Sequence, residues 1–220
     1  MDGWIATRHG HKVRPLDLDP DEVDIRDIAH ALSNLCRFTG HTPVLYSVAQ
    51  HSILVASYVV PEHRLAALLH DASEAYLCDL ARPMKRLPEF AFYREAEDRA
   101  MGVIAKKFGF AWPMAPEVEA ADLLLLATEG RDLMPARYAD WDIKPPQYPV
   151  LDLEIQPWDA ALVKNVFLWA FVKLTEGDRG SIPSHFQHAL PRCVRWIFDG
   201  NTREVSVGAQ ELLDRLRRNQ

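Results

Sequence analysis

The sequence predicts an all-α fold, a bundle of helices built from 220 residues. Three observations support this prediction. Apolar residues recur at spacings of three and four along most of the chain, and strand-like patterns are few and short. The chain is also 48% hydrophobic and 25% charged, the ordinary balance of a globular protein long enough to bury a substantial core.

The first elements are expected near the N-terminus. Residues 4–7 and 12–16 flank a His-Gly-His tripeptide at 9–11, which predicts a small hairpin. Apolar residues at helical spacing then predict a helix that starts at Asp24 and runs to about Leu35.

The middle of the chain carries the next helix signals. Ser47 can cap a helix that contains His51. Pro61 is well placed to open a helix over residues 62–76, and residues 79–88 hold two prolines that predict a loop.

Three more helices are expected after this loop. Residues 89–108 form an amphipathic pattern that ends at Gly109, and residues 116–134 form a very apolar one that we expect to be central. A proline-rich loop follows at 135–157, and then a helix rich in large apolar residues at 158–174.

The expected domain covers residues 1–180, with a C-terminal extension of uncertain structure at 181–220. Within that extension, residues 204–218 could form a terminal helix. The large apolar residues at 158–174 fit either the core or a surface between copies in a homo-oligomer.

Charge and composition exclude several classes of function. The net charge is -6 and no basic run dominates, which argues against binding long nucleic acid but leaves a small polyanion such as a nucleotide possible. The three scattered cysteines favour reduced thiols in a cytoplasmic protein. We see neither a signal peptide nor a stretch of eighteen apolar residues, so no membrane partner is expected.

The candidate chemistry starts from the adjacent pair His70 and Asp71. On a helix, neighbouring side chains diverge by about 100°, so both could reach one cation. His51 upstream and Asp122 downstream would complete a nitrogen and oxygen cage for a divalent metal. The ordinary alternatives are core histidines and, for Asp122, a salt bridge to an arginine.

Two further carboxylates lie near this pair in the sequence. Glu74 follows His70 by four residues and would share its helix face, where it could serve as general acid or base. Asp79 in the following loop could orient water or receive a substrate hydroxyl. Their alternatives are a surface glutamate and a turn or cap residue.

These residues resemble the HD-domain phosphohydrolase superfamily, and more narrowly the bacterial 5′-deoxynucleotidases and small phage HD proteins of the dATP triphosphohydrolase type. The resemblance spans about residues 24–175 and rests on His70-Asp71-Ala72-Ser73-Glu74, Asp79-Leu80, Pro83 and Lys85. It implies an HD-domain helical bundle. It also implies that the metal ligands are His51, His70, Asp71 and Asp122, and that the catalytic residues are Glu74 and Asp79.

The resemblance also implies substrate-binding residues. Arg37 and Phe38 occupy the place of an arginine and aromatic pair that contacts phosphate and sugar, and Lys85 could hold phosphate oxygens. Phe38 stands where relatives often carry tryptophan, and Ala81 replaces a proline of the deoxynucleotidases, so the substrate is less defined than the chemistry.

The sequence therefore predicts a metal-dependent phosphohydrolase acting on a small-molecule nucleotide substrate. It would convert a dNTP to deoxynucleoside and tripolyphosphate, or a dNMP to deoxynucleoside and phosphate. The cofactor would be a divalent ion (Mn, Co, Fe, Zn or Mg). Arg82 and Arg86 beside Lys85 favour including triphosphates. The alternative is a noncatalytic nucleotide-binding or metal-stabilised helical interaction module.

Overall fold

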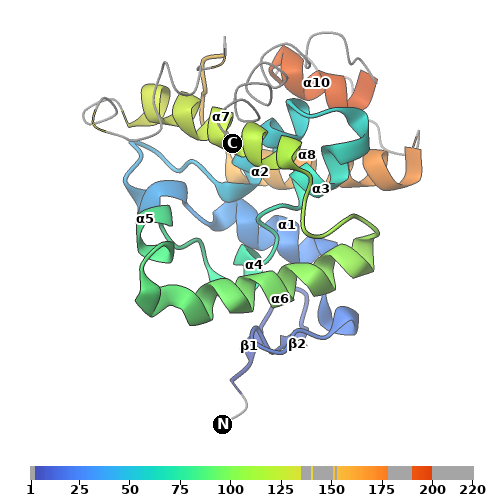
Figure 1. The fold of residues 1–220 in the computed structure, drawn as a ribbon. Coiled ribbons are helices and arrows are strands. Elements are labelled where there is room, and N and C mark those ends of the chain that lie inside the picture. The colour runs from blue at the N-terminus through green and yellow to red at the C-terminus, as the bar shows by residue number, and fades with distance from the viewer. Residues whose placement is uncertain (1–2, 135–139, 141–150, 152, 178–189, 200–220) are drawn as a thin grey trace.

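The structure, a computed structural model, describes residues 3–134, 140, 151, 153–177 and 190–199. This part is mostly helical, as predicted, with one two-stranded sheet (Figure 1). The α-helices are α1 (Ile25–Asn34), α2 (Val48–Ser57), α3 (Arg64–Leu68), α4 (Glu74–Leu77), α5 (Arg82–Lys85), α6 (Ala91–Phe108), α7 (Pro116–Leu133), α8 (Ala160–Glu176) and α10 (Arg192–Asp199). None of these described helices combines the length and the apolar character needed to cross a membrane.

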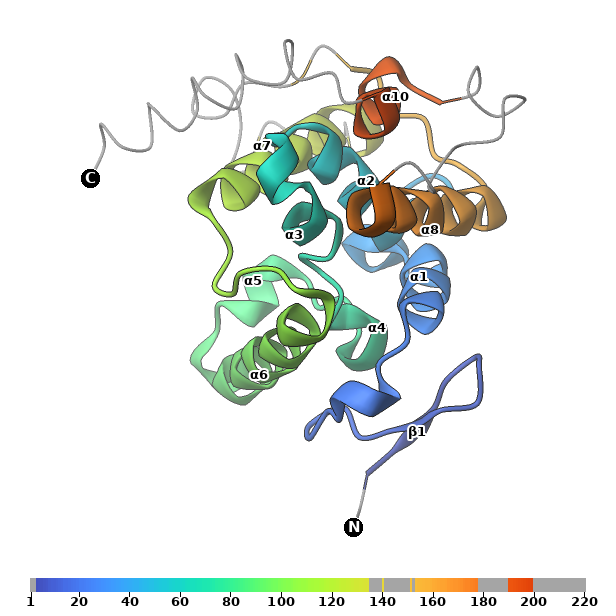
Figure 2. The same cartoon turned by 90° about the vertical axis from the view of Figure 1, so that its right-hand side faces the viewer.

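The predicted hairpin is confirmed, in a shorter form. Strands β1 (Ile5–Ala6) and β2 (Lys12–Val13) pair antiparallel, with Ile5 opposite Val13. The hairpin lies at the end of the molecule opposite to α10 (Figures 1 and 2). It leads through a short 3-10 helix (Pro20–Glu22) into α1.

The centre of the bundle is α2. The Ser47 hydroxyl accepts a hydrogen bond from the Gln50 amide and caps the helix, as predicted, and every residue of α2 is buried. A helix surrounded on all sides must be packed by neighbours, and here these are α1, α3, α7, α8 and α10. His51 therefore enters the site from the most enclosed helix of the described fold.

Helices α1, α6, α7 and α8 lie close to their predicted positions. Asp24 caps α1, α6 ends at Gly109 with a positive φ of 78°, and the apolar stretch of α7 is buried as expected for a central helix. On α8, Phe167 is fully buried and the other large aromatic residues pack against the core. The apolar side of α8 is thus part of the core, and homo-oligomer formation stays a prediction.

The single helix predicted over residues 62–76 is wrong. The chain forms a 3-10 turn (Pro61–His63), then α3, a non-helical turn at 69–73, and α4. In that turn the Ala72 amide bonds to the Leu69 carbonyl, and the Glu74 amide bonds to the Asp71 carbonyl, each three residues back. His70 and Asp71 therefore lie on a tight turn and share no helix face with Glu74.

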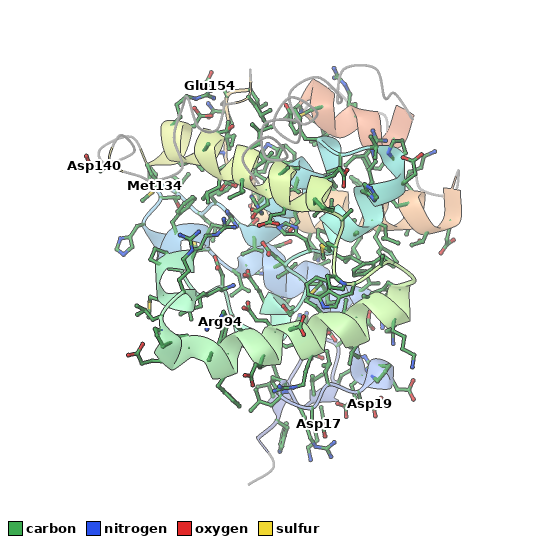
Figure 3. All side chains as sticks on the ribbon, in the orientation of Figure 1. Asp17, Asp19, Arg94, Met134, Asp140 and Glu154 are labelled. Atoms are coloured by element: carbon green, nitrogen blue, oxygen red, sulfur yellow. The ribbon has the colours of Figure 1, made fainter. Side chains whose placement is uncertain are left out.

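One further segment differs from its prediction, and two predicted segments lie largely outside the described residues. The loop expected at 79–88 contains the short helix α5, and Arg94 of α6 donates hydrogen bonds to the carbonyls of Lys85 and Leu87, which ties this segment to α6 (Figure 3). Most of the proline-rich loop and the terminal helix expected at 204–218 lie outside the described residues.

The described part of the expected C-terminal extension is α10. Its buried residues Cys193, Val194 and Ile197 belong to the same hydrophobic cluster as α2 and α8. The domain boundary at residue 180 stays a prediction.

Candidate metal centre

Four predicted residues from three parts of the chain meet at one point. His51 comes from α2, His70 and Asp71 from the turn between α3 and α4, and Asp122 from α7. The His51 Nε2 atom lies 3.3 Å from His70 Nε2 and 3.1 Å from Asp122 Oδ1. Asp71 Oδ2 lies 3.2 Å from His70 Nε2 and 3.9 Å from His51 Nε2.

The orientation of both imidazoles follows from their other nitrogen. His51 Nδ1 lies 2.6 Å from Glu129 Oε1, and His70 Nδ1 lies 2.8 Å from the Ala67 carbonyl oxygen. Since a carboxylate and a carbonyl can only accept here, both Nδ1 atoms carry the proton. The two Nε2 atoms therefore face each other at 3.3 Å, an arrangement that requires a cation or a proton between them.

The spacing of these atoms fits a bound metal ion. Nitrogen and oxygen ligands about 2.1 Å from a divalent ion stand roughly 3.0–3.4 Å from one another. The separations of 3.1, 3.2 and 3.3 Å match this range, whereas Asp71 Oδ2 and His51 Nε2 are 3.9 Å apart. The ligand atoms of His51, His70 and Asp71 all lie within 4.8 Å of one another, and Asp122 joins this group through its contact with His51. The described residues thus include a histidine and aspartate cluster that could hold a divalent cation.

A buried carboxylate that the sequence analysis missed supports the site. Glu129 of α7 is fully buried and accepts hydrogen bonds from Arg37 Nη2, from the Tyr46 hydroxyl and from His51 Nδ1. It follows Asp122 by seven residues, which is two helical turns, so both project from the same face of α7. That spacing is the signal that could have identified it.

The charges of the site favour a cation at the His51 Nε2 position. Burial and Arg37 lower the pKa of His51, but Glu129 and Asp122 outweigh them and raise the pKa to about 9. Burial raises the pKa of Asp71, yet His70 and His51 hold it well below its ordinary value. In the absence of metal, the carboxylates thus hold a positive charge where the ion would sit.

Asp122 also makes the arginine salt bridge that was its alternative interpretation. Its Oδ2 atom lies 2.5 Å from Arg82 Nη2, while its Oδ1 atom faces His51. The two oxygens serve different partners, so the salt bridge leaves one oxygen directed at the cluster. Burial would raise the pKa of Asp122, and His51 and Arg82 instead hold it well below the ordinary range.

Arg37 and Phe38 lie at the edge of the cluster. The Arg37 guanidinium is buried, lies 2.8 Å from Glu129 Oε2 and lies 3.8 Å from Asp71 Oδ2. Phe38 has a positive φ of 54° and packs partly buried against the core. Arg37 is therefore held beside the predicted ligands by protein carboxylates, and its contact with a substrate stays a prediction.

Glu74 and Lys85 form a hydrogen-bonded pair in the same electrostatic environment as Asp71 of the cluster. Lys85 Nζ lies 3.0 Å from Glu74 Oε1 and 2.7 Å from Glu97 Oε1. Glu74 is 4% exposed, and its Oε2 atom has no hydrogen-bond partner among the described residues. Burial, Asp71 and Asp79 raise the pKa of Glu74 well above its ordinary value.

Asp79 is half-buried in the loop after α4. Burial raises its pKa, Arg37 and Lys85 lower it, and Asp71 raises it, with a net increase. These influences place Asp79 in the same electrostatic environment as the cluster. Its catalytic role stays a prediction.

Comparisons with known proteins identify relatives without assigning an activity. The chain is 46% identical over 131 residues to the Escherichia coli protein named "Uncharacterized protein YfdR", covering 59% of this chain and 72% of that protein. It is 33% identical over 143 residues to an uncharacterized protein of Rhodobacter capsulatus, covering 59% of this chain and 72% of the relative. The chain matches none of the protein-family models.

Proposed function

This chain belongs to the family of the Escherichia coli YfdR protein, and we propose that it is a metal-dependent phosphohydrolase of the HD type that acts on deoxynucleotides. The observation that carries the proposal is the pair of facing Nε2 atoms of His51 and His70, 3.3 Å apart, with aspartates on both sides. Glu74 interacts electrostatically with Asp71 and is a buried carboxylate with one oxygen that lacks a hydrogen-bond partner among the described residues, a group that a purely structural metal site would not need.

The ligands of the metal would be His51, His70, Asp71 and Asp122. When bound, a divalent cation would polarise a phosphate oxygen and lower the pKa of a water molecule. Glu129 keeps the His51 ring oriented with Nε2 toward the cluster, because it accepts the proton of Nδ1.

Glu74 is the proposed proton donor. Burial, Asp71 and Asp79 raise its pKa, so Glu74 keeps its proton to a higher pH than an ordinary glutamate, which suits donation of a proton to the 5′-oxygen that leaves phosphorus. Lys85 donates a hydrogen bond to Glu74 Oε1, which leaves Oε2, an oxygen without a hydrogen-bond partner among the described residues, to carry the proton. In this proposal Lys85 positions Glu74, whether or not it also contacts phosphate.

Arg37, Phe38 and Asp79 would bind the nucleotide. Arg37 is charged and held in place by Glu129, so its guanidinium can meet phosphate without first being ordered. Phe38 beside it could exclude a ribose 2′-hydroxyl, and Asp79 could accept a hydrogen bond from a sugar hydroxyl.

Product analysis tests the proposal directly. Metal-reconstituted protein is incubated with each dNTP, each dNMP and the matching ribonucleotides, and the products are separated by chromatography. Deoxynucleoside with tripolyphosphate would identify a triphosphohydrolase, and deoxynucleoside with phosphate from dNMPs would identify a 5′-deoxynucleotidase. The absence of turnover despite bound metal would overturn the proposal in favour of a noncatalytic binding module.

A further inference from the structure

A second histidine and aspartate cluster lies at the N-terminal end of the fold, apart from the centre described above. Its members are His11 on the hairpin and Asp24 and Asp27 at the start of α1. We propose that these three residues form a second divalent-metal site, one that fastens the hairpin to α1.

The three side chains each offer one ligand atom within 4.8 Å of the others. His11 Nε2 lies 3.4 Å from Asp24 Oδ2 and 4.0 Å from Asp27 Oδ2. Ligands about 2.1 Å from one ion are roughly 3.0–3.4 Å apart, so the first pair is already at a ligand spacing. The second pair needs a contraction of a few tenths of an ångström or more, within reach of a rotation of the half-exposed His11 ring.

An unpaired oxygen on Asp27 points independently to a missing partner. Asp27 is 3% exposed, and its Oδ1 atom accepts hydrogen bonds from the His9 amide at 2.9 Å and from His9 Nδ1 at 2.6 Å. Within the described chain, Oδ2 is buried and has no partner at full hydrogen-bond distance, although, against the effect of burial, the Thr7 side chain, together with His9, helps to hold the pKa of Asp27 below its ordinary value. A buried, unpaired carboxylate oxygen is costly, and a cation shared with His11 would satisfy it.

His9 takes the role of an outer partner in this arrangement. Its ring and its backbone amide both bind the same oxygen of Asp27, which fixes the carboxylate and leaves Oδ2 directed at His11. Hydrogen bonds of this kind orient the ligands of known metal sites. The cluster therefore contains three ligand atoms, and hydrogen bonds from His9 hold the Asp27 carboxylate in place.

Asp24 already has a cation as neighbour, which the metal would have to displace. Arg26 Nη2 lies 2.5 Å from Asp24 Oδ2, and the Arg26 side chain is 60% exposed. Arg26 Nε also donates hydrogen bonds to both carboxylate oxygens of Asp24, so the metal would have to replace a bidentate contact made by an exposed arginine. Asp24 Oδ1 keeps its cap on the Arg26 amide in either case.

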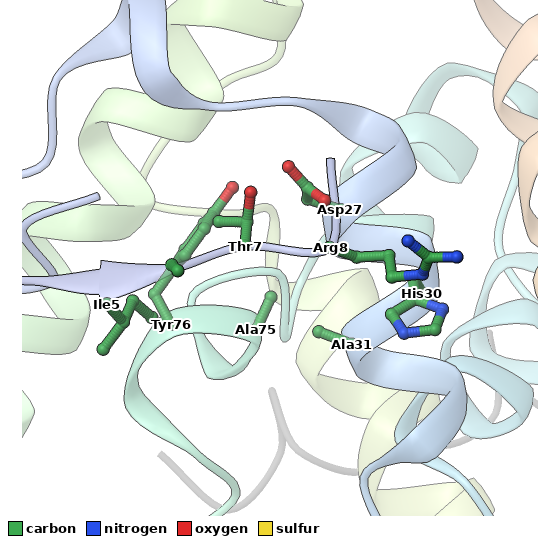
Figure 4. Close-up of a pocket in the computed structure, with 9 residues that line it drawn as sticks. Ile5, Thr7, Arg8, Asp27, His30, Ala31, Ala75 and Tyr76 are labelled. Atoms are coloured by element: carbon green, nitrogen blue, oxygen red, sulfur yellow. The ribbon is translucent and has the colours of Figure 1, made fainter. Parts of the chain in front are cut away.

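Solvent reaches the neighbourhood of the site. A cavity of about 350 Å³ lies beside Asp27, between the hairpin, α1 and α4, and Thr7, His30 and Tyr76 also line it, whereas His11 and Asp24 do not (Figure 4). His11 is 34% exposed, which leaves room for water to complete the coordination shell. One imidazole with two carboxylates suits Zn²⁺, Co²⁺ or Mn²⁺, whereas Ca²⁺ and Mg²⁺ prefer oxygen ligands only.

A metal here would compensate for the small size of the hairpin. Each strand has two residues, and an isolated hairpin of this length is marginal in water. The bond from His11 to α1 through an ion would add to the contacts that already hold the hairpin, namely the burial of Val13 and the hydrogen bonds of His9 to Asp27.

Metal stoichiometry of the full chain tests this inference. Chelator-treated protein is dialysed against Zn²⁺ and its bound metal is counted, for the wild type, Asp71→Ala, His11→Gln and the double variant. We expect two equivalents for the wild type, one for each single variant and none for the double variant. Asp27→Asn, which keeps the shape of the side chain, should lose the same equivalent as His11→Gln.

The matched control is His63→Gln. His63 is 33% exposed and lies 3.8 Å from a single carboxylate, that of Glu117, so its loss should leave both equivalents in place. Circular dichroism of each variant verifies folding. Zn²⁺ should also raise the melting temperature of Asp71→Ala but not of the double variant. The inference is overturned if Asp71→Ala binds no Zn²⁺, or if His11→Gln and Asp27→Asn bind as much as the wild type.

Discussion

At the scale of single residues, Glu129 determines which nitrogen of His51 faces the cluster. It accepts the Nδ1 proton of His51 and is itself held by Arg37 and Tyr46. Burial raises the pKa of Glu129, but Arg37 and His51 hold it below its ordinary value, so it remains charged. A charged partner makes the opposite imidazole nitrogen a stronger metal ligand.

We expect Glu129→Gln to bind Zn²⁺ about 10- to 100-fold more weakly than the wild type, because the outer partner of His51 loses its charge. Competition with a chromogenic chelator measures the affinity. Glu119→Gln, an exposed position on the same helix, is the control and should bind as the wild type does. Equal affinities of Glu129→Gln and the control would contradict this role.

Glu74 should control the alkaline side of the pH profile. Burial, Asp71 and Asp79 raise its pKa, so the proton is present below the raised pKa and is lost as the pH rises through it. Activity should fall in that direction. Glu74→Gln should lose about 100- to 10,000-fold in kcat and show no alkaline decline of this origin. Glu95→Gln, on the exposed side of α6, is the control. A Glu74→Gln profile that keeps the wild-type rate and shape would rule out proton donation by this residue.

Part of the site could be predicted at this scale and part could not. His51, His70, Asp71 and Asp122 carry a motif in the sequence, and the structure brings them together. The contacts of Glu129 with Arg37 and Tyr46 join residues 92 and 83 positions apart, which no local pattern reveals.

At the scale of elements, the turn at 69–73 is where the structure differs most clearly from the helix predicted from the sequence. The apolar spacing continues across it, and no glycine or proline marks a break, so a continuous helix was the natural prediction. The turn presents His70 and Asp71 together toward α2 and α7, which consecutive positions of a straight helix would direct about 100° apart. Helices with a cap in the sequence, such as α1 and α2, were predicted closely.

The two glycines of the α6 region should respond to alanine with opposite signs. Gly109 ends α6 with a φ of 78°, where alanine is strained by about 1–2 kcal/mol. Gly102 lies inside the helix, where an added Cβ would approach Trp112 at 4.0 Å, an ordinary contact. Gly102→Ala should therefore stabilise the protein by about 0.5–1 kcal/mol. Urea unfolding measures both, and destabilisation by Gly102→Ala would show that α6 is packed differently.

At the scale of the whole molecule, the metal should act as part of the core. The cluster joins α2, the turn after α3, and α7, and much of the described fold packs around α2. An ion bound only by the folded state at about 100 times its Kd adds about 2.7 kcal/mol to the free energy of unfolding. For a protein of this size that corresponds to a rise in Tm of roughly 5–10 °C.

Thermal melts of chelator-treated protein, with and without added Mn²⁺ or Zn²⁺, measure this effect. Double substitution of His11 and Asp71 should abolish the shift, since both proposed sites are then removed. A Tm that does not depend on metal in the wild type would contradict binding at either site.

The most direct test of the central claim is the dependence of deoxynucleotide hydrolysis on added metal. Metal-free protein is titrated with Mn²⁺ in the presence of mixed dNTPs and dNMPs, and release of deoxynucleoside is followed for the wild type and Asp71→Ala. We predict that hydrolysis appears with the metal, saturates as the site fills, and is absent in Asp71→Ala. If the wild type binds metal and Asp71→Ala does not, but the wild type hydrolyses no deoxynucleotide, the proposed phosphohydrolase function is contradicted.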